Sequence, residues 1–327
     1  MSKLVTIYGG SGFIGRHIVR RMAKQGWRVR VAVRHPNEAL FVKPYGVVGQ
    51  VEPIFCNIRD DQSAALAMKG ADAVVNCVGI LNEYKKNNFE DVQSGGAERI
   101  ARLAKEAGIE TLVQISAIGA NPDSQSEYAR TKAEGEAAVL RHMPGAVILR
   151  PSIVFGPGDS FFNRFGSMAR FGPVLPIVGA DTKFQPVYVD NVAEAAEKAL
   201  LGQAEPGVYE LGGPDVRSFR EWMIGMLGVI RRRRLVVGMP FAVAGFMGWG
   251  FDLLQTLSLG FFENKVLTRD QVRNLHADNV VSEGAKGLAD LGISPTPTEA
   301  VLDDYLWRFR PGGQYDEITE SARNMRV

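Results

Sequence analysis

Two different spacings of apolar residues alternate along the first 211 residues. Short runs that are apolar or alternate with period two predict strands at 3–8, 28–33, 51–55, 73–75, 111–115, 146–149 and 208–211. Stretches with apolar side chains at helical spacing predict helices at 12–25, 60–68, 89–107, 126–141 and 192–201. Because strands that alternate with helices need crossover connections, the pattern predicts an α/β protein with a doubly wound parallel sheet covered on both faces.

The pattern changes after residue 151. Residues 156–186 are rich in Gly, Pro and Phe and are expected to form loops and short elements. From residue 219 onward the spacing is mostly helical, ending in a helix at 298–310. We therefore divide the chain into three parts. They are a nucleotide-binding domain with a loop excursion (1–215), a smaller and mostly helical C-terminal domain (216–310), and a polar tail (311–327).

Closely spaced glycines join the first predicted strand to the first predicted helix. Gly9, Gly12 and Gly15 give G-x-x-G-x-x-G, and Gly10 with the last two also gives G-x-G-x-x-G. Such glycines allow a tight turn, let a pyrophosphate approach the backbone and let helix and strand pack closely. The alternative is a β-α turn without a ligand. Because the motif follows a strand and opens a helix, it predicts nucleotide binding, with the turn residues Ser11, Phe13 and Ile14 beside the phosphates.

The end of the second predicted strand indicates which nucleotide is bound. Enzymes that use NAD usually carry an acid there to hold the ribose hydroxyls, whereas this chain has Arg34. A guanidinium suits the 2′-phosphate of NADP(H), and Arg16 is a second candidate contact. The alternative for either residue is a solvated surface charge, and NAD(H) then stays possible.

Composition excludes several classes of protein. The chain is 46% hydrophobic and 23% charged, as in ordinary globular proteins, and its net charge of +2 gives no reason to expect nucleic acid. Two cysteines rule out a disulfide scaffold and indicate a reducing compartment, and four scattered histidines show no metal spacing. The first residues lack the basic and apolar segments of a secretory signal, so none is expected.

Several motifs together resemble the extended and atypical short-chain dehydrogenases. They lie at 9–15 (GGSGFIG), 57–60 (NIRD), 76–79 (NCVG), 128–132 (YARTK) and 149–158 (LRPSIVFGPG). The resemblance covers residues 1 to about 215 and implies a Rossmann domain. It also implies that Asn57 and Ile58 lie against adenine, that Val78 and Gly79 lie against the ribose and pyrophosphate, and that the nicotinamide is bordered by Pro151, Ser152 and Ile153.

Four further motifs narrow the resemblance to one atypical branch. They lie at 183–192 (KFQPVYVDNV), 267–273 (LTRDQVR), 278–281 (DNVV) and 305–313 (YLWRFRPGG). The branch contains the alpha-subcomplex subunit 9 family of respiratory complex I, in its bacterial form. The resemblance implies an accessory subunit that holds NADPH tightly, lies beside the quinone-binding region and has no established turnover. Its partners would be other subunits of complex I, at the cytoplasmic face of the inner membrane.

Three residues form a candidate active site. Tyr128 and Lys132 are four positions apart on a predicted helix and share a face. In the superfamily that the chain resembles, the Tyr is the general acid or base, the Lys lowers its pKa, and a Ser, here Ser116, completes the group. Only eleven residues separate Ser116 from Tyr128, fewer than in catalytic relatives. The alternative is that Tyr128 and Lys132 only hold the cofactor ribose.

A basic and apolar segment at 231–262 is the candidate docking surface. Four arginines, 231–234, precede 17 uncharged residues, 235–251, which contain Phe241, Met247, Trp249 and Phe251. Glycine, proline and the following Asp argue against a spanning helix. The composition favours contact with an anionic membrane surface or a membrane subunit. A buried helix of the second domain, or a lid over a groove, is the alternative.

The sequence therefore indicates an NADPH-binding accessory subunit of complex I. Two other functions stay open. One is a soluble NADP-dependent reductase, epimerase or dehydratase that acts on a sugar nucleotide or a quinone precursor, which the retained Tyr128 and Lys132 favour. The other is a redox-sensing regulator that reports the state of NADP(H) through a binding partner.

Overall fold

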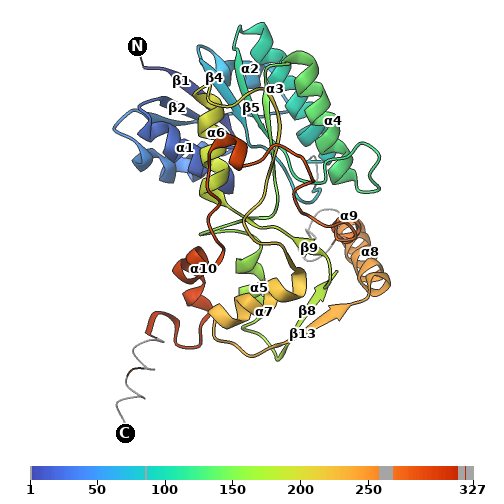
Figure 1. The fold of residues 1–327 in the computed structure, drawn as a ribbon. Coiled ribbons are helices and arrows are strands. Elements are labelled where there is room, and N and C mark those ends of the chain that lie inside the picture. Colours follow the sequence, from blue (N-terminus) through green and yellow to red (C-terminus); the bar gives the residue numbers. More distant parts are fainter. Residues whose placement is uncertain (1, 85–86, 258–267, 316–320, 322–327) are drawn as a thin grey trace.

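A parallel sheet of seven strands organises the larger part of the molecule (Figure 1). The computed structural model describes residues 2–84, 87–257, 268–315 and 321. The sheet has the order β3-β2-β1-β4-β5-β6-β11. Its strands in chain order are β1 (Leu4–Tyr8), β2 (Arg28–Val33), β3 (Val51–Phe55), β4 (Ala73–Asn76), β5 (Thr111–Ile115), β6 (Val147–Pro151) and β11 (Gly207–Leu211). The strand order reverses between β1 and β4, and in such sheets ligands bind at the carboxyl ends beside that point.

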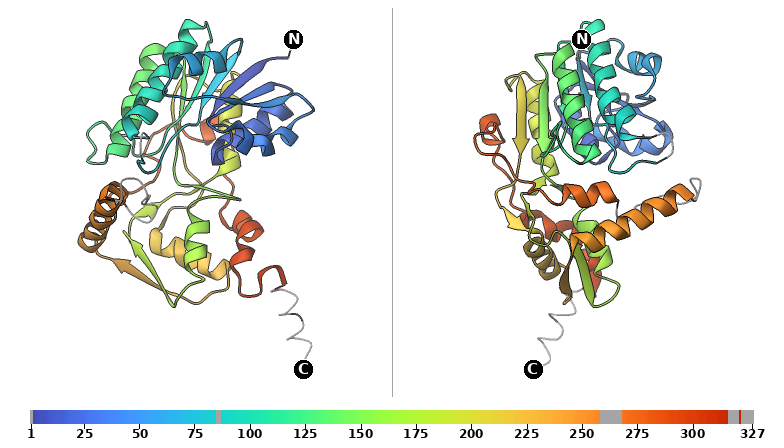
Figure 2. Two further views of the ribbon diagram at one scale, coloured as in Figure 1. Left: turned by 180° about the vertical axis from the view of Figure 1, so that it is seen from behind. Right: turned by 90° about the vertical axis from the view of Figure 1, so that its right-hand side faces the viewer.

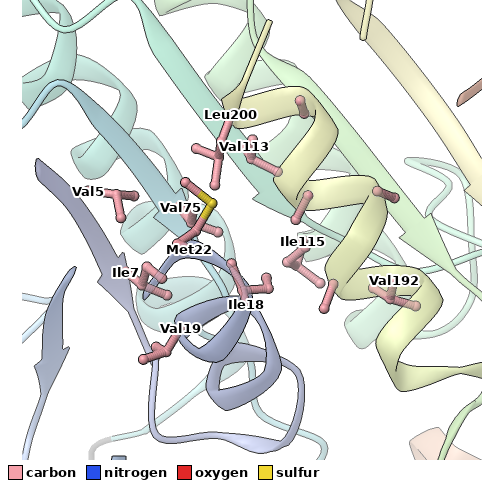
Figure 3. Close-up of a cluster of buried hydrophobic side chains, with 14 of the residues drawn as sticks. Val5, Ile7, Ile18, Val19, Met22, Val75, Val113, Ile115, Val192 and Leu200 are labelled. Carbon is pink, nitrogen blue, oxygen red and sulfur yellow. The ribbon is translucent and has the colours of Figure 1, made fainter. Parts of the chain in front are cut away.

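Helices cover both faces of the sheet (Figures 1 and 2). One face carries α1 (Phe13–Lys24) and α6 (Val189–Leu200), and the other carries α2 (Asp61–Met68), α3 (Gly95–Glu106) and α4 (Glu127–His142). The core under α1 and α6 is shown in Figure 3. It joins side chains of the strands, of α1 and of α6, among them Val5, Ile7, Val75, Val113, Ile115, Ile18, Val19, Met22, Val192 and Leu200. The predicted doubly wound α/β fold is confirmed.

One element of this domain was not predicted. A 3-10 helix, η1 (Pro36–Tyr45), follows β2 and packs beside β3. Only Ala39 and Val42 of the segment are buried, so it has no broad apolar face whose spacing could have predicted a helix. The predicted helix at 89–107 is also divided, since a π-helical turn, η2 (Glu90–Ser94), precedes α3.

A smaller unit lies below the sheet, at the carboxyl ends of its strands (Figure 1). Its core contains many aromatic side chains, including Phe155, Phe162, Phe219, Trp222 and Phe309. The unit is assembled from β7 (Val154–Phe155), α5 (Phe162–Met168), β8 (Val174–Val178), β9 (Lys183–Phe184), β10 (Val187–Tyr188), β12 (Arg217–Ser218), α7 (Phe219–Val229), β13 (Leu235–Met239), α10 (Glu299–Leu306) and η4 (Trp307–Phe309).

The chain passes between the two units more than once. Residues 153–188 contribute to the core of the smaller unit, although the sequence groups them with the first domain. Later in the chain, Leu288, Leu291 and Ile293 return to the core of the sheet domain. The division at residue 215 stays a prediction about chain segments, whereas in space each unit combines separated segments.

The predicted docking segment at 231–262 is divided in the structure. Its arginines precede β13, which pairs with β8, and the strand is followed by α8 (Phe241–Leu257). The Nε of Arg232 donates to the Phe309 carbonyl (2.6 Å) and that of Arg234 donates to the Ala169 carbonyl (2.8 Å). These two arginines therefore hold the smaller unit together, and α8 begins at the far end of β13. Residues 258–262 lie outside the described residues.

A second short helix, α9 (Arg269–Asn274), packs against α8. Among the described residues, no helix has the length and apolar character needed to cross a membrane.

Candidate functional site

The glycine turn joins β1 to α1 as predicted. Gly9 has a φ of +72°, a conformation that favours glycine, and its N–H donates to the Ala32 carbonyl (2.9 Å). A Cβ on Gly15 would collide with the Gly9 carbonyl oxygen, so this position needs glycine for helix and turn to pack. Gly12 precedes α1, whose first turn has neither a side-chain cap nor an acidic residue. The first N–H groups of α1 are therefore available to an anion, together with the positive end of the helix dipole.

A cavity of about 320 Å³ opens beside this turn, at the carboxyl ends of β1 to β4. Eight of the predicted cofactor residues line it: Gly9, Ser11, Gly12, Arg34, Asn57, Ile58, Val78 and Gly79. Phe13, Ile14, Gly15 and Arg16 do not line the cavity, although the first three form the start of the helix that faces it. The structure thus brings eight of the predicted cofactor contacts to one place, whereas Tyr128, Lys132, Pro151, Ser152 and Ile153 do not line this cavity.

The two candidate phosphate-binding arginines differ in their surroundings. Arg34 follows β2, is exposed and lines the cavity, and none of the described carboxylates forms an ion pair with it. The Arg16 guanidinium instead donates to the Pro157 carbonyl (2.8 Å) and lies over the Phe13 ring. Arg34 is therefore placed to meet a ribose phosphate, whereas Arg16 joins the turn to the 157–158 loop.

Sequence reasoning missed other residues that line the cavity. These are Tyr8, Ala32, Val33, His35, Glu38, Cys56, Arg59, Cys77, Ile80, Asn87 and Val92. Tyr8, Val33, Cys56 and Cys77 occupy the last position of a strand or directly follow one, so the rule that ligands bind at the carboxyl ends of strands could have found these four. Glu38, Asn87 and Val92 come from elements folded back over the cavity, and no local signal marks them.

Lys132 connects the cavity to the candidate active site. It lies on α4 and is 7% exposed. A Cβ on Gly79 would be 3.2 Å from its Nζ, which also donates to the Ile115 carbonyl (3.4 Å). The Nζ is 6.0 Å from the centre of the Tyr128 ring. Gly79, Tyr128 and Lys132 thus lie together, next to the predicted ribose and pyrophosphate contacts.

Burial shifts the pKa of both members of the Tyr–Lys pair. Burial lowers the pKa of Lys132 to about 8, against the opposing effects of the Glu136 carboxylate and Cys77. Burial raises the pKa of Tyr128 to about 12, so the phenol stays protonated near neutral pH. Ser116 is buried, and its hydroxyl has no hydrogen-bond partner among the described residues. A general base works best with a pKa near the working pH, which Tyr128 does not have in this state.

The predicted nicotinamide border lies at the end of β6. Pro151 is the last residue of that strand, and Ile153 packs against the core of the smaller unit. Ser152 is buried, and its hydroxyl bonds to the side-chain oxygen (2.7 Å) and the carbonyl (3.0 Å) of Asn279. The Ser152 hydroxyl therefore joins the two units of the protein.

The remaining candidate ligands do not converge. No group of three or more metal-binding side chains lies together in the part of the chain that the structure describes. Burial raises the pKa of Cys56 to about 11 and that of Cys77 to about 12, so both are neutral thiols in the wall of the cavity.

The strand order, the glycine turn and the cavity beside it define a dinucleotide-binding α/β protein. The profile of the NAD dependent epimerase/dehydratase family matches residues 5–212, and the chain belongs to this family. A solved dTDP-glucose 4,6-dehydratase from Bacillus anthracis, in complex with NAD, shares the fold with a TM-score of 0.69 at 15% identity over 98% of both chains.

Two relatives match much of the chain. NADH dehydrogenase (ubiquinone) 1 alpha subcomplex subunit 9, mitochondrial, of Arabidopsis thaliana is 34% identical over 316 residues, which cover 95% of this chain and 79% of the relative. The ceramide reductase of Caulobacter vibrioides is 32% identical over 241 residues, which cover 72% of this chain and 74% of the relative. The resemblance to the alpha-subcomplex subunit 9 branch is thereby confirmed.

Proposed function

We propose that this protein is an NADP(H)-binding accessory subunit of respiratory complex I that lies on the cytoplasmic face of the inner membrane. The observation that carries the proposal is the extent of the match. The epimerase/dehydratase profile ends at residue 212, whereas the match to the alpha-subcomplex subunit 9 relative covers 95% of the chain. The match therefore extends well beyond the nucleotide fold, into the part of the chain that forms the smaller unit.

The surroundings of Tyr128 and Lys132 support a structural role for the nucleotide. A protonated Tyr128 and a buried Lys132 ammonium can donate to ribose oxygens without any turnover. The hydroxyl of Ser116, which would orient a reacting carbonyl in an enzyme, has no partner among the described side chains. Arg34 at the cavity edge supports NADP(H) as the nucleotide.

One face of α8 is the proposed contact with the membrane surface. Its apolar side chains are unusually exposed, namely Val243, Phe246, Met247, Trp249 and Leu253. Large apolar side chains gathered on one exposed surface mark interaction sites. The exposed Arg231 and Arg233 lie before β13 and add positive charge that suits anionic lipid.

Purification of complex I from gently solubilised membranes tests the proposal. We expect native mass spectrometry to find this chain within the complex and to find one NADP(H) released with it. A chain that leaves the membrane fraction alone, while the complex stays whole, would contradict the assignment as a subunit.

Exchange of charge at Arg34 tests the nucleotide preference. We expect Arg34→Asp to weaken NADPH binding by roughly 10- to 100-fold and to leave NADH binding nearly unchanged, because a charge-assisted bond to the 2′-phosphate is replaced by repulsion. The measurement is titration of both nucleotides by fluorescence. Glu38→Gln is the matched control: it removes a negative charge from the same cavity and should leave the preference intact or strengthen it. Equal affinities for the two nucleotides in the parent protein would rule out NADP(H) preference.

A second function has specific support. The relative named ceramide reductase and the retained Ser116, Tyr128 and Lys132 favour an NADP-dependent reductase, epimerase or dehydratase. Its substrate would be a sugar nucleotide, a quinone precursor or a lipid carbonyl. Oxidation of NADPH by the purified protein, dependent on one added substrate class, would establish this function in place of the structural one.

Variants of the Tyr–Lys pair distinguish the two functions. We expect Tyr128→Phe to leave assembly of complex I intact, because the ring and its packing remain. We expect Lys132→Met to weaken NADPH binding at least tenfold, because the ribose loses a charged donor. Loss of a metabolite in a Tyr128→Phe strain with a normal complex would instead indicate an enzyme.

With a pKa of about 8, Lys132 is charged below pH 8 and neutral above it, so NADPH affinity should fall as the pH rises through 8.

A further inference from the structure

The N-terminus of α4, which carries Tyr128, is held by a residue from a distant part of the chain. The carboxylate of Asp270, on α9, accepts hydrogen bonds from the Ser126 hydroxyl (2.7 Å), the Glu127 N–H (2.8 Å) and the Tyr128 N–H (3.2 Å). Figure 1 shows α9 directly below the end of α4. One side chain thus satisfies two of the backbone donors that a helix leaves unpaired in its first turn.

This contact also fixes the candidate site. Tyr128 is the second residue of α4, and the Asp270 carboxylate binds the backbone of the Tyr itself. The N-cap residue Ser126 accepts from the Ala129 N–H, so Asp270 adds to that cap and also holds the Ser126 hydroxyl. A negative charge at this end of the helix is favoured by the helix dipole. Lys132 follows one turn later, with its Nζ beside Gly79 of the cavity. Any shift of Asp270 therefore changes the start of the helix that places both side chains.

On its other side, α9 is fixed to α8. The Arg269 N–H, next to Asp270, donates to the Asp252 carboxylate of α8 (3.1 Å). A Cβ on Gly248 of α8 would be only 3.1 Å from the Arg269 nitrogen, so the two helices approach closely there. Trp249, the next residue of α8, is 46% exposed. The exposed face of α8 is thus one residue away from its contact with α9.

A second connection runs from α8 to the same tyrosine. The Gln255 amide donates to the Glu83 carbonyl (3.1 Å), and the Glu83 carboxylate accepts from the Phe89 N–H (2.8 Å). The Phe89 ring meets the Tyr128 ring edge to face, with centroids 5.9 Å apart. Asn87, which lies between Glu83 and Phe89 in the chain, lines the nucleotide cavity.

We propose that Asp270 is a positioning residue of the nucleotide site, and that α8 and α9 couple NADP(H) binding to attachment of the exposed α8 face to a lipid surface. The inference rests on the proposed function. Both connections are continuous, from the exposed face of α8 through α9 or Glu83 to Tyr128. Because coupling between two binding sites is reciprocal, lipid that holds α8 in place tightens NADP(H) binding, and NADP(H) tightens attachment by the same factor.

The experiment measures NADPH affinity of the full chain with and without vesicles that contain phosphatidylglycerol. In the parent protein we expect vesicles to lower the NADPH dissociation constant about fivefold or more. Asp270→Ala should raise the dissociation constant about tenfold without vesicles and reduce the effect of vesicles to the part that the Glu83 connection carries. Asp270→Asn keeps one acceptor oxygen, so it should give an intermediate effect, and it tests the same contact if Asp270→Ala fails to fold.

A matched control removes an equivalent cap elsewhere. The Ser218 hydroxyl caps α7 in the smaller unit, far along the chain from the nucleotide contacts. Ser218→Ala should lower the melting temperature but leave NADPH affinity and the vesicle effect unchanged. Parent protein that binds both NADPH and vesicles without any mutual effect, or Asp270 variants that keep the full effect, would overturn the coupling and leave the proposed function standing. Parent protein that binds no NADP(H) would overturn both.

Discussion

Gly12→Val is expected to abolish NADP(H) binding and to lower the stability of the folded protein. Gly12 lines the cavity and has extended backbone angles, φ −68° and ψ 177°, that any residue adopts. A Cβ there would lie 3.1 Å from the Gly9 carbonyl oxygen, so the turn must shift slightly to accept it. A side chain there would occupy the space in which a pyrophosphate approaches the N–H groups of α1. We expect at least a 100-fold loss of affinity by calorimetry. The variant should also lose the stabilisation that ligand gives, about 2.7 kcal/mol when its concentration is 100 times the dissociation constant.

Gly145→Val is the matched control for this prediction. It lies in the same domain between α4 and β6, and a Cβ there meets nothing within 4 Å. The control should bind NADP(H) like the parent protein and keep the rise in melting temperature on addition of ligand. If Gly12→Val bound NADPH with unchanged affinity, the cavity beside the glycine turn could not be the nucleotide site.

Removal of the exposed aromatic rings of α8 is expected to release the protein from lipid. Phe246 is 72% exposed and Trp249 is 46% exposed, with ring centroids 5.8 Å apart. Burial of one such side chain in an apolar surrounding contributes roughly 1.5–3 kcal/mol. The double variant Phe246→Ala with Trp249→Ala should therefore lower the fraction of protein that floats with anionic liposomes by about 10-fold or more, because it loses the burial free energy of two rings. Because neither ring is in the core, the melting temperature should hardly change.

Two comparisons make this prediction specific. Phe41→Ala removes an aromatic side chain that is 47% exposed on the nucleotide domain and should leave flotation unchanged. Arg231→Gln with Arg233→Gln should weaken attachment mainly at low salt, where charges are least screened, and leaves the carbonyl contacts of Arg232 and Arg234 in place. Unfolding of the Phe246 and Trp249 variant, without separate loss of attachment, would show that the face belongs to the core. The side chain of Phe251, predicted to take part, lies outside the described residues.

The smaller unit and the docking segment show where local patterns are insufficient. The sequence presents the stretch after the arginines as one uncharged segment, yet its first residues form β13 because β8, distant in sequence, provides a hydrogen-bonding edge. A short apolar run does not itself distinguish strand from helix, so the partner decides. The roles of Arg232 and Arg234 were equally invisible, because their acceptors lie on residues 309 and 169.

The sequence by itself determined the sheet domain and the start of the cofactor site. Periodicity located its strands and most of its helices within a few residues, and glycine spacing located the turn, because both signals depend on neighbours only a few positions apart. Arg34 was found for the same reason, as the residue that directly follows a strand. Only the tertiary structure decided that Arg16 bonds to Pro157, that Ser152 bonds to Asn279 and that Asp270 caps α4. Each of these contacts joins residues more than 120 positions apart, and no spacing along the chain encodes which distant groups the fold brings within hydrogen-bonding distance.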